Sequence, residues 1–206
     1  MTRKAISIYM SATCAMLIVA PGRFVCGILL ALEVILLMFF GTLFRTLLKK
    51  IGLQKSSQTC VMLLTIFIVI FYKQLLILFM PEIAMQMGFI IYFPAITTFA
   101  TVFLMENQQN NLKTELKQNM IPAFLFSIYS LLTSLFRDIL GFGTITLPAV
   151  GKQLEIAIFN EDKVSALNFI ATIPGSFVFS ALLLAGYLAI ERKLNILQKV
   201  KQEEDK

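Results

Sequence analysis

Long apolar stretches separated by short polar ones dominate the chain. About 20 mostly apolar residues are needed to cross the hydrocarbon core of a bilayer as a helix, and six stretches meet or approach that length. They cover roughly residues 5–20, 24–44, 59–80, 87–105, 120–136 and 169–190. The pattern predicts an all-α integral membrane protein with six transmembrane helices.

The first stretch has a second interpretation. It is short and follows Arg3 and Lys4, an arrangement that is also typical of a cleavable signal peptide. Ile18-Val19-Ala20 is a poor cleavage site, however, and Pro21 comes directly after it. Both alternatives stay open, with retention of the first span favoured.

Polar segments connect the apolar stretches. Residues 54–58 and 106–119 form loops, and the segment after residue 190 is a cytoplasmic tail that ends at residue 206. In the long connection 141–163, Leu154, Ile158 and Phe159 recur at helical spacing. This spacing predicts a short amphipathic helix there.

The basic residues are distributed unevenly across the predicted membrane. Six spans place both termini on the same side, and that side carries thirteen Lys and Arg against four on the other. Cytoplasmic loops are enriched in Lys and Arg, so both termini are predicted to be cytoplasmic. Lys73 is the one remaining basic residue and lies within a span.

Composition narrows the functional classes. Hydrophobic residues make up 58% of the chain and charged residues 15%, with a mean hydropathy of +0.81, which a soluble fold of 206 residues cannot bury. The net charge of +6 follows the membrane pattern and indicates no nucleic-acid partner. Histidine is absent, which excludes histidine bases and metal ligands. Three cysteines in or beside apolar runs do not indicate a disulfide framework.

Two helix ends resemble each other. Leu43-Phe44-Arg45-Thr46-Leu47-Leu48 closes the second stretch, and Leu135-Phe136-Arg137-Asp138-Ile139-Leu140 closes the fifth. Copies three spans apart have opposite orientations in the membrane, which is the architecture of inverted-repeat transport proteins. We therefore predict two inverted three-helix repeats, one over about 5–80 and one over about 87–190. Chance similarity between Leu- and Phe-rich segments is the alternative.

Proline interrupts the fourth stretch. Pro94 lies seven residues into it, where it removes a backbone donor, and the Thr97 and Thr98 hydroxyls are placed to satisfy freed backbone groups. The interruption predicts either the broken helix of an inverted-repeat protein or an ordinary packing kink.

The segment after the fifth stretch resembles a known family. Arg137, Gly141, Gly143 and Thr144 match the Arg-(Glu)-x-x-Gly-x-Gly-Thr motif of the RnfE/NqrD family, membrane subunits of the Rnf ferredoxin:NAD oxidoreductase and the Na⁺-translocating NADH:quinone reductase. Further similarity to this family lies in Ile158-Phe159, Ile173-Pro174-Gly175-Ser176-Phe177, Leu183-Leu184-Ala185-Gly186 and Ile190-Glu191-Arg192, and around Tyr92–Thr98.

The resemblance implies a partner and a cofactor. It implies a six-helix subunit of the bacterial inner membrane that pairs with an RnfA/NqrE-like sister and assembles with flavin- and iron–sulfur-bearing subunits. Two cysteines from each of the paired subunits hold a [2Fe–2S] centre in the membrane. Cys14 matches the first cysteine position, but Ala100 occupies the second. The resemblance therefore predicts an iron centre that is weakened or lost, with Cys14 either its ligand or a packed small hydrophobe.

Two charges lie inside predicted spans. Glu33 and Lys73 fall at similar depths on adjacent antiparallel helices, so the sequence predicts a candidate intramembrane pair. Such a pair is either a step on an ion path or a neutralised structural pair, with Lys73 snorkelling outward as a further alternative.

Three functions compete at this point. The first is a subunit, not catalytic alone, of an Rnf/Nqr-type complex that couples electron transfer to Na⁺ or H⁺ translocation. The second is the substrate-binding membrane component of a small-solute, vitamin-type transporter. The third is a scaffolding subunit of the redox complex that has lost its cofactor.

The charge count makes a topology prediction. Both termini are predicted to be cytoplasmic. Of two reporter enzymes fused after Lys206, the one that works in the cytoplasm should therefore be active, and the one that works only outside it should be inactive. Activity of a reporter that functions only outside the cytoplasm would reverse the topology.

Overall fold

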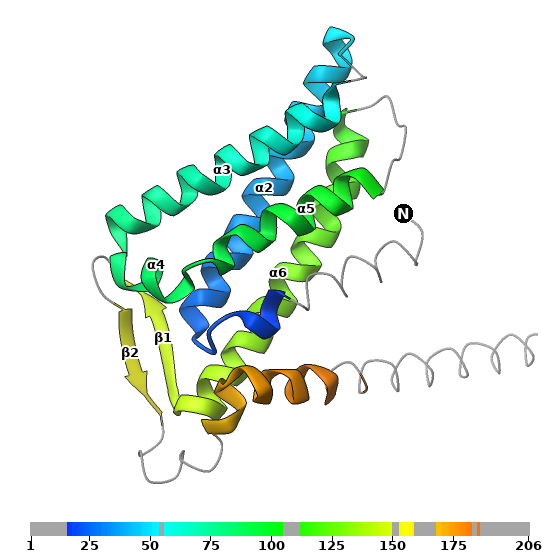
Figure 1. Cartoon of the computed structure of the whole chain (residues 1–206). Coiled ribbons are helices and arrows are strands. Elements are labelled where there is room, and N and C mark those ends of the chain that lie inside the picture. The colour runs from blue at the N-terminus through cyan, green and yellow to red at the C-terminus, as the bar shows by residue number, and fades with distance from the viewer. Residues whose placement is uncertain are drawn as a thin grey trace, which may run out of the picture.

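The computed structural model describes residues 16–53, 56–104, 112–149, 153–158, 168–182 and 185. A helical turn at 16–19 precedes the longer elements (Figure 1). The elements in order are α2 (Phe24–Ile51), α3 (Ser57–Phe79), α4 (Pro81–Met87), η1 (Ile90–Tyr92), α5 (Phe93–Leu104), α6 (Leu112–Phe142), β1 (Thr144–Pro148), β2 (Gln153–Ala157), η2 (Asn168–Ala171) and a helix over Ile173–Leu182.

Three of the described helices are long and apolar enough to cross a membrane. They are α2, α3 and the Glu115–Phe142 part of α6. This confirms the helical, membrane-like character predicted for the second, third and fifth stretches. Most of the first stretch and the end of the sixth lie outside the described residues.

The fourth stretch is not a single helix. α4 ends at Met87 and is followed by Gly88, whose positive φ of 49° is one that glycine adopts readily. η1 then separates α4 from α5. Pro94 is the second residue of α5 and lies in its first turn, where the missing N–H has no intrahelical partner to lose. The interruption predicted at Pro94 therefore lies before that residue, over 88–92.

The threonines after Pro94 behave differently from each other. The Thr97 hydroxyl donates to the carbonyl of Pro94 at 3.0 Å, which is the usual bond of a threonine to the preceding turn of its own helix and does not involve a group freed by the proline. The Thr98 hydroxyl is buried and has no hydrogen-bond partner among the described residues.

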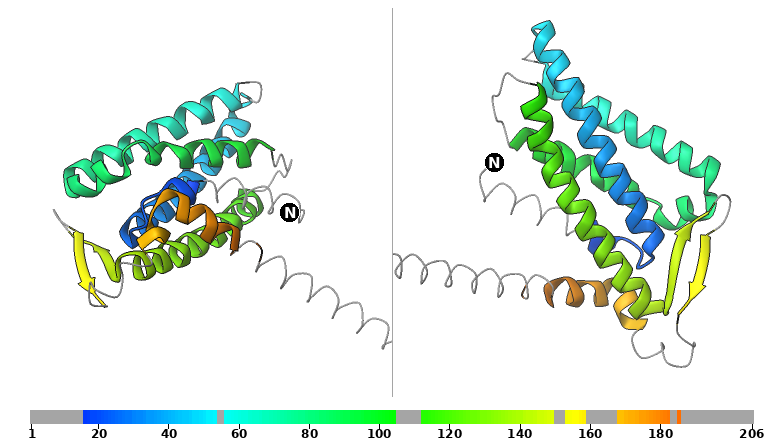
Figure 2. Two further views of the ribbon diagram at one scale, coloured as in Figure 1. Left: turned by 60° about the horizontal axis from the view of Figure 1, so that its bottom comes forward. Right: turned by 180° about the vertical axis from the view of Figure 1, so that it is seen from behind.

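The centre of the fold is the antiparallel pair of α2 and α6 (Figures 1 and 2). Their contact is made of small residues. The Ser130 hydroxyl donates to the carbonyl of Gly27 at 3.5 Å, and the Ser127 hydroxyl donates to the carbonyl of Ala31 at 3.3 Å. A Cβ on Gly27 would overlap the Ser134 side chain. Small residues at this spacing let two backbones approach closely, which is how helices associate in lipid.

Ion pairs connect α2 and α6 at the other end of their contact. The Glu115 carboxylate, in the first turn of α6, lies 3.1 Å from Lys49 Nζ and 3.9 Å from Arg45 Nη1, both near the end of α2. Arg45 is the residue that corresponds to Arg137 in the repeated hexapeptide. The two arginines therefore lie toward opposite ends of the α2–α6 pair.

α3 and α5 pack against α2 and against each other. The Tyr72 hydroxyl on α3 donates to the carbonyl of Leu29 on α2 at 2.9 Å. Much of the remaining surface of α3 is apolar and exposed, with Leu63 64%, Phe67 66% and Leu78 73% exposed. A helix with such a face fits lipid or another membrane subunit and not water.

The connection after α6 is a β-hairpin and not the amphipathic helix predicted from Leu154, Ile158 and Phe159. β1 and β2 pair antiparallel, with Thr144 opposite Ala157 and Pro148 opposite Gln153. Residues four positions apart, such as 154 and 158, share a face in a strand, where side chains repeat every two residues. They also nearly share one in a helix, where the repeat is 3.6 residues. Phe159 lies outside the described residues.

Substitution of Gly27 tests the close packing of α2 on α6. Gly27→Ala should destabilise the protein by about 1–3 kcal/mol because the new methyl group would overlap Ser134. Gly41→Ala on the same helix is the matched control, since a Cβ there has no neighbour within 4 Å. Thermal unfolding in detergent compares the two, and equal stability of both variants would contradict the proposed packing.

Candidate functional site

The candidate site is the helix break between the first and second apolar stretches. Pro21 and Gly22 separate the helical turn at 16–19 from α2, which begins at Phe24. A broken helix exposes carbonyl oxygens at one end and N–H groups at the other, and each must find a partner in apolar surroundings. Side chains from later in the sequence satisfy both ends.

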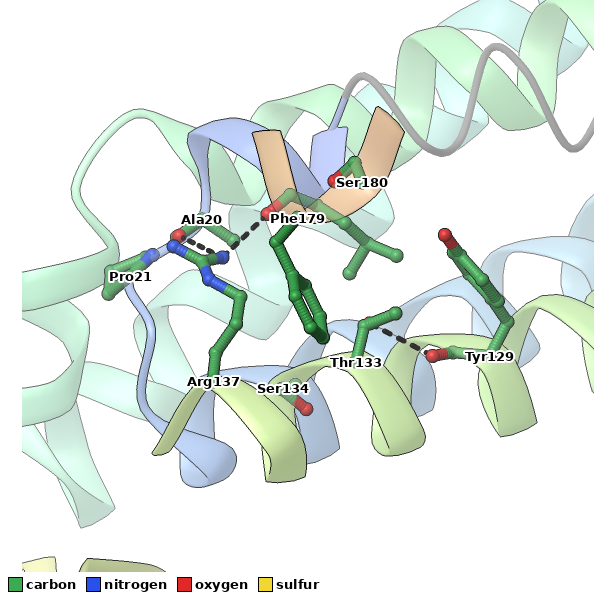
Figure 3. A pocket seen from close by; sticks show the side chains of 10 residues that line it. Ala20, Pro21, Tyr129, Thr133, Ser134, Arg137, Phe179 and Ser180 are labelled. Atoms are coloured by element: carbon green, nitrogen blue, oxygen red, sulfur yellow. Dashed lines mark hydrogen bonds between the residues drawn. The ribbon is translucent and has the colours of Figure 1, made fainter. Parts of the chain in front are cut away.

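Arg137 binds the carbonyl end. Its Nη1 donates to the carbonyls of Leu17 at 2.9 Å and Ala20 at 3.0 Å, and its Nη2 donates to that of Ala171 in η2 at 3.3 Å. Figure 3 shows the guanidinium extending from α6 to the chain at Ala20. The Ser176 hydroxyl donates to the carbonyl between them, that of Ile18, at 2.7 Å.

Asp138 binds the N–H end. Its Oδ2 accepts hydrogen bonds from the backbone N–H of Phe24 at 3.1 Å and from the N–H and hydroxyl of Thr146 at 2.8 and 2.7 Å. Its Oδ1 accepts one from the Thr144 hydroxyl at 3.2 Å. The Thr146 oxygen in turn accepts from the N–H of Val25 at 3.2 Å. One carboxylate thus joins α2, α6 and β1.

Consecutive positions on one helix explain how two side chains reach two helix ends. Neighbouring residues on a helix project about 100° apart, so Arg137 and Asp138 point to different elements. Their charges also match the partial charges they meet, since a helix C-terminus favours a cation and an N-terminus an anion. The fifth stretch, expected to end at Phe136, runs on to Phe142 as α6, which buries both charges.

Glycines allow the elements around the break to approach. Gly143, directly before Thr144 and β1, has a φ of 67°, which side chains rarely adopt. A Cβ on Gly141 would lie 2.6 Å from Cβ of Ala171, and one on Gly22 would lie 3.2 Å from Cα of the same residue. η2 therefore packs against α6 at a distance that requires glycine at position 141, and it lies close to the break at Gly22.

The space beside the break is small. A cavity of about 10 Å³ is lined by residues from the turn at 16–19, α6 and the helix over Ile173–Leu182, including Tyr129, Thr133 and Phe179 (Figure 3). This volume holds at most one water molecule. Because the polar backbone groups are already bound and the cavity is small, the break described here is a structural junction and not a solute-binding site.

Glu33 and Lys73, predicted as a candidate pair, do not bind each other in the structure. Lys73 Nζ donates to the Tyr92 hydroxyl at 3.2 Å and lies 5.0 Å from the centre of that ring. Both oxygens of the fully buried Glu33 lack a hydrogen-bond partner among the described residues. Similar depth on adjacent helices did not imply similar direction: Tyr72, one residue before Lys73, is the α3 residue that faces α2.

Of the two positions expected to hold a [2Fe–2S] centre, the structure describes the one that is not a cysteine. Ala100 lies in α5 and supplies no ligand atom, and Cys14 lies outside the described residues. Cys26 is buried in α2 and Cys60 is half-buried near the start of α3. The described residues contain no group of three or more Cys, Asp or Glu side chains placed to hold a metal.

Sequence reasoning missed three residues of the junction. Asp138 appears in the sequence analysis only as part of the hexapeptide that closes the fifth stretch, and neither Thr146 nor Ser176 has a predicted role. An acidic residue next to an arginine at the end of an apolar stretch was the available signal for Asp138, since intramembrane charges are rarely unpaired. Partners that lie more than 100 residues away, such as Phe24 and Asp138, leave no local pattern.

Comparison with known proteins gives no relative. No protein-family model, curated protein or solved structure matches the chain.

Two threonines of β1 provide a matched test of the junction. Thr146→Val should cost about 1–3 kcal/mol because the N–H of Val25 loses its acceptor and Asp138 loses a donor in a buried position. Thr144→Val should cost under about 1 kcal/mol, since the hydrogen bond of its hydroxyl to Asp138 is longer, at 3.2 Å, and lies in a half-buried position. Denaturation in detergent measures both, and a larger loss for Thr144→Val would contradict the described junction.

Proposed function

We propose that the chain is a membrane subunit of an Rnf/Nqr-type electron-transport complex, which couples electron transfer between ferredoxin or NADH and an acceptor to Na⁺ or H⁺ translocation. It is not catalytic alone. The proposal places it in the bacterial inner membrane, with cytoplasmic termini, next to an RnfA/NqrE-like sister subunit and the flavin- and iron–sulfur-bearing subunits.

The observation that carries the proposal is the junction at the broken helix. Arg137, Gly141, Gly143 and Thr144, which resemble the RnfE/NqrD motif, all belong to it. Ser176, which belongs to the separate resembling segment 173–177, binds the same carbonyl end as Arg137. Residues from separate resembling segments thus serve one structural purpose, which supports the resemblance more strongly than either segment does by itself.

A second interruption supports the inverted-repeat architecture. α4 ends at Met87, and the next α-helix, α5, begins only at Phe93. In the proposed arrangement α5 is the counterpart of the first stretch, and α6 is the counterpart of α2. Discontinuous helices are a feature of inverted-repeat transport proteins, and the interruption at 88–92 agrees with the proposal in this respect.

A vitamin-type transporter is less well supported. Its substrate site needs a cavity of several hundred Å³ with a few convergent polar groups. The cavity at the broken helix is about 10 Å³. A larger space of about 300 Å³ lies beside Lys73, but it is an open groove lined mainly by apolar residues of α3 and α4.

The scaffolding variant of the redox proposal concerns the cofactor. With Ala100 at the second cysteine position, this subunit brings at most Cys14 to a shared centre. Thiolate ligands offset the cost of placing the metal in a low dielectric, so incomplete ligation weakens binding. We therefore propose a weakened or lost [2Fe–2S] centre.

Purification of the tagged full chain from native membranes in mild detergent tests the assignment. The expected result is co-purification of a sister subunit with flavin- and iron–sulfur-bearing subunits, identified by mass spectrometry. Iron content and low-temperature EPR of that complex should be unchanged by Cys14→Ala, because the proposed centre is weak or absent.

Two outcomes would contradict these statements separately. Recovery of a pair of ABC-type ATPases in place of the redox subunits would replace the assignment with the transporter. A full [2Fe–2S] signal that disappears in Cys14→Ala would leave the assignment intact and show that the centre is retained.

A further inference from the structure

Glu33 occupies an unusual place for a carboxyl group. It is the tenth residue of α2 and therefore lies about 14 Å along the helix axis from Phe24. α2 has 28 residues and is about 42 Å long, which exceeds the hydrocarbon core of about 30 Å, and Glu33 therefore lies well inside the helix and not at either end. The side chain is fully buried between α2 and the helices that pack on it.

No group in the described part of the chain stabilises a negative charge on Glu33. Neither carboxyl oxygen has a hydrogen-bond partner there. The neighbouring buried residues of α2 are apolar: Leu30, Val34 and Leu37. On α3, the hydroxyl of Tyr72 is donated to the carbonyl of Leu29 and not to Glu33.

Titratable groups on the other elements lie elsewhere. Lys73 on α3 is bound to Tyr92 of η1, and Glu82 on α4 is exposed. α5 has no titratable side chain between Phe93 and Leu104. On α6, Tyr129 is the only titratable residue between Met120 and Phe136, and the charged residues lie toward the two ends of the helix.

These surroundings determine the charge state. An unpaired carboxylate without hydrogen bonds in an apolar interior costs several kcal/mol, and protonation removes that cost. A bound Na⁺ would need several oxygen ligands, which hard cations require, and the described residues place no cluster of acidic side chains around Glu33. A proton needs only the carboxyl group itself.

We propose that Glu33 is a proton-binding site in the interior of the α2 span, held as the neutral carboxylic acid at neutral pH and able to exchange its proton with the aqueous phase. Its use in translocation rests on the proposed function; the site itself does not. If the complex moves H⁺, Glu33 is the residue of this subunit where a proton resides between uptake and release.

Infrared spectroscopy of the purified full chain in lipid tests the site directly. A protonated carboxyl has a C=O band separate from the amide bands. We expect such a band at about pH 7, shifted by ¹³C-glutamate labelling and by transfer to D₂O, and lost as the pH is raised well above the range in which exposed carboxyls ionise. Addition of Na⁺ at constant pH should leave it unchanged.

Variants assign the band to one residue. Glu33→Gln should remove it, whereas Glu115→Gln, at a buried glutamate that is paired with Lys49, should retain it. If Glu33→Gln does not fold, Glu33→Asp keeps an acid at the site, and its band should no longer shift with ¹³C-glutamate.

Each contrary result would overturn the proposal. These results are the absence of the band at about pH 7, its persistence in Glu33→Gln, no shift in D₂O, or its loss on addition of Na⁺. The measurement needs no redox partner. The site can therefore fail while the Rnf/Nqr-type assignment stands, or stand when that assignment fails.

Discussion

The fold depends on the need to satisfy backbone polar groups where a helix breaks in apolar surroundings. Each free N–H or C=O left without a partner in such a place costs energy comparable to a lost hydrogen bond or more. The break at Pro21 creates such groups on both sides, and one dipeptide of α6, Arg137-Asp138, binds both. The position of α6, the start of β1 and the approach of η2 all follow from where those two side chains must reach.

Small residues make this arrangement geometrically feasible. The guanidinium and the carboxylate reach their partners only if α6 lies close to α2, and Gly27 with the serines of α6 provides that closeness. At the opposite end of the pair, Glu115 binds Lys49 and Arg45 from α2. Charges therefore fix the two ends of α2 against α6, and close packing of small residues fills the length between them.

The sequence predicted what depends on local pattern and missed what depends on distant partners. Apolar length was enough to locate α2, α3 and most of α6, because the bilayer imposes a length on a spanning helix. Periodicity misassigned Leu154 and Ile158, whose spacing fits both a strand and a helix. The resemblance pointed to Arg137 and the glycines near it. The roles of Asp138 and Thr146 required knowledge of which helix end lies beside them, which no spacing in the sequence encodes.

The separation between the partners of this junction has a consequence for biosynthesis. Asp138, which accepts a hydrogen bond from the N–H of Phe24, lies 114 residues later in the chain. At a translation rate of about 5–20 residues per second, roughly 6–23 s pass between synthesis of the start of α2 and synthesis of its cap. During that time the first N–H groups of α2 need water or lipid headgroups as partners. The start of α2 therefore receives its cap only after α6 has been synthesised, so this junction is completed late in the folding of the chain.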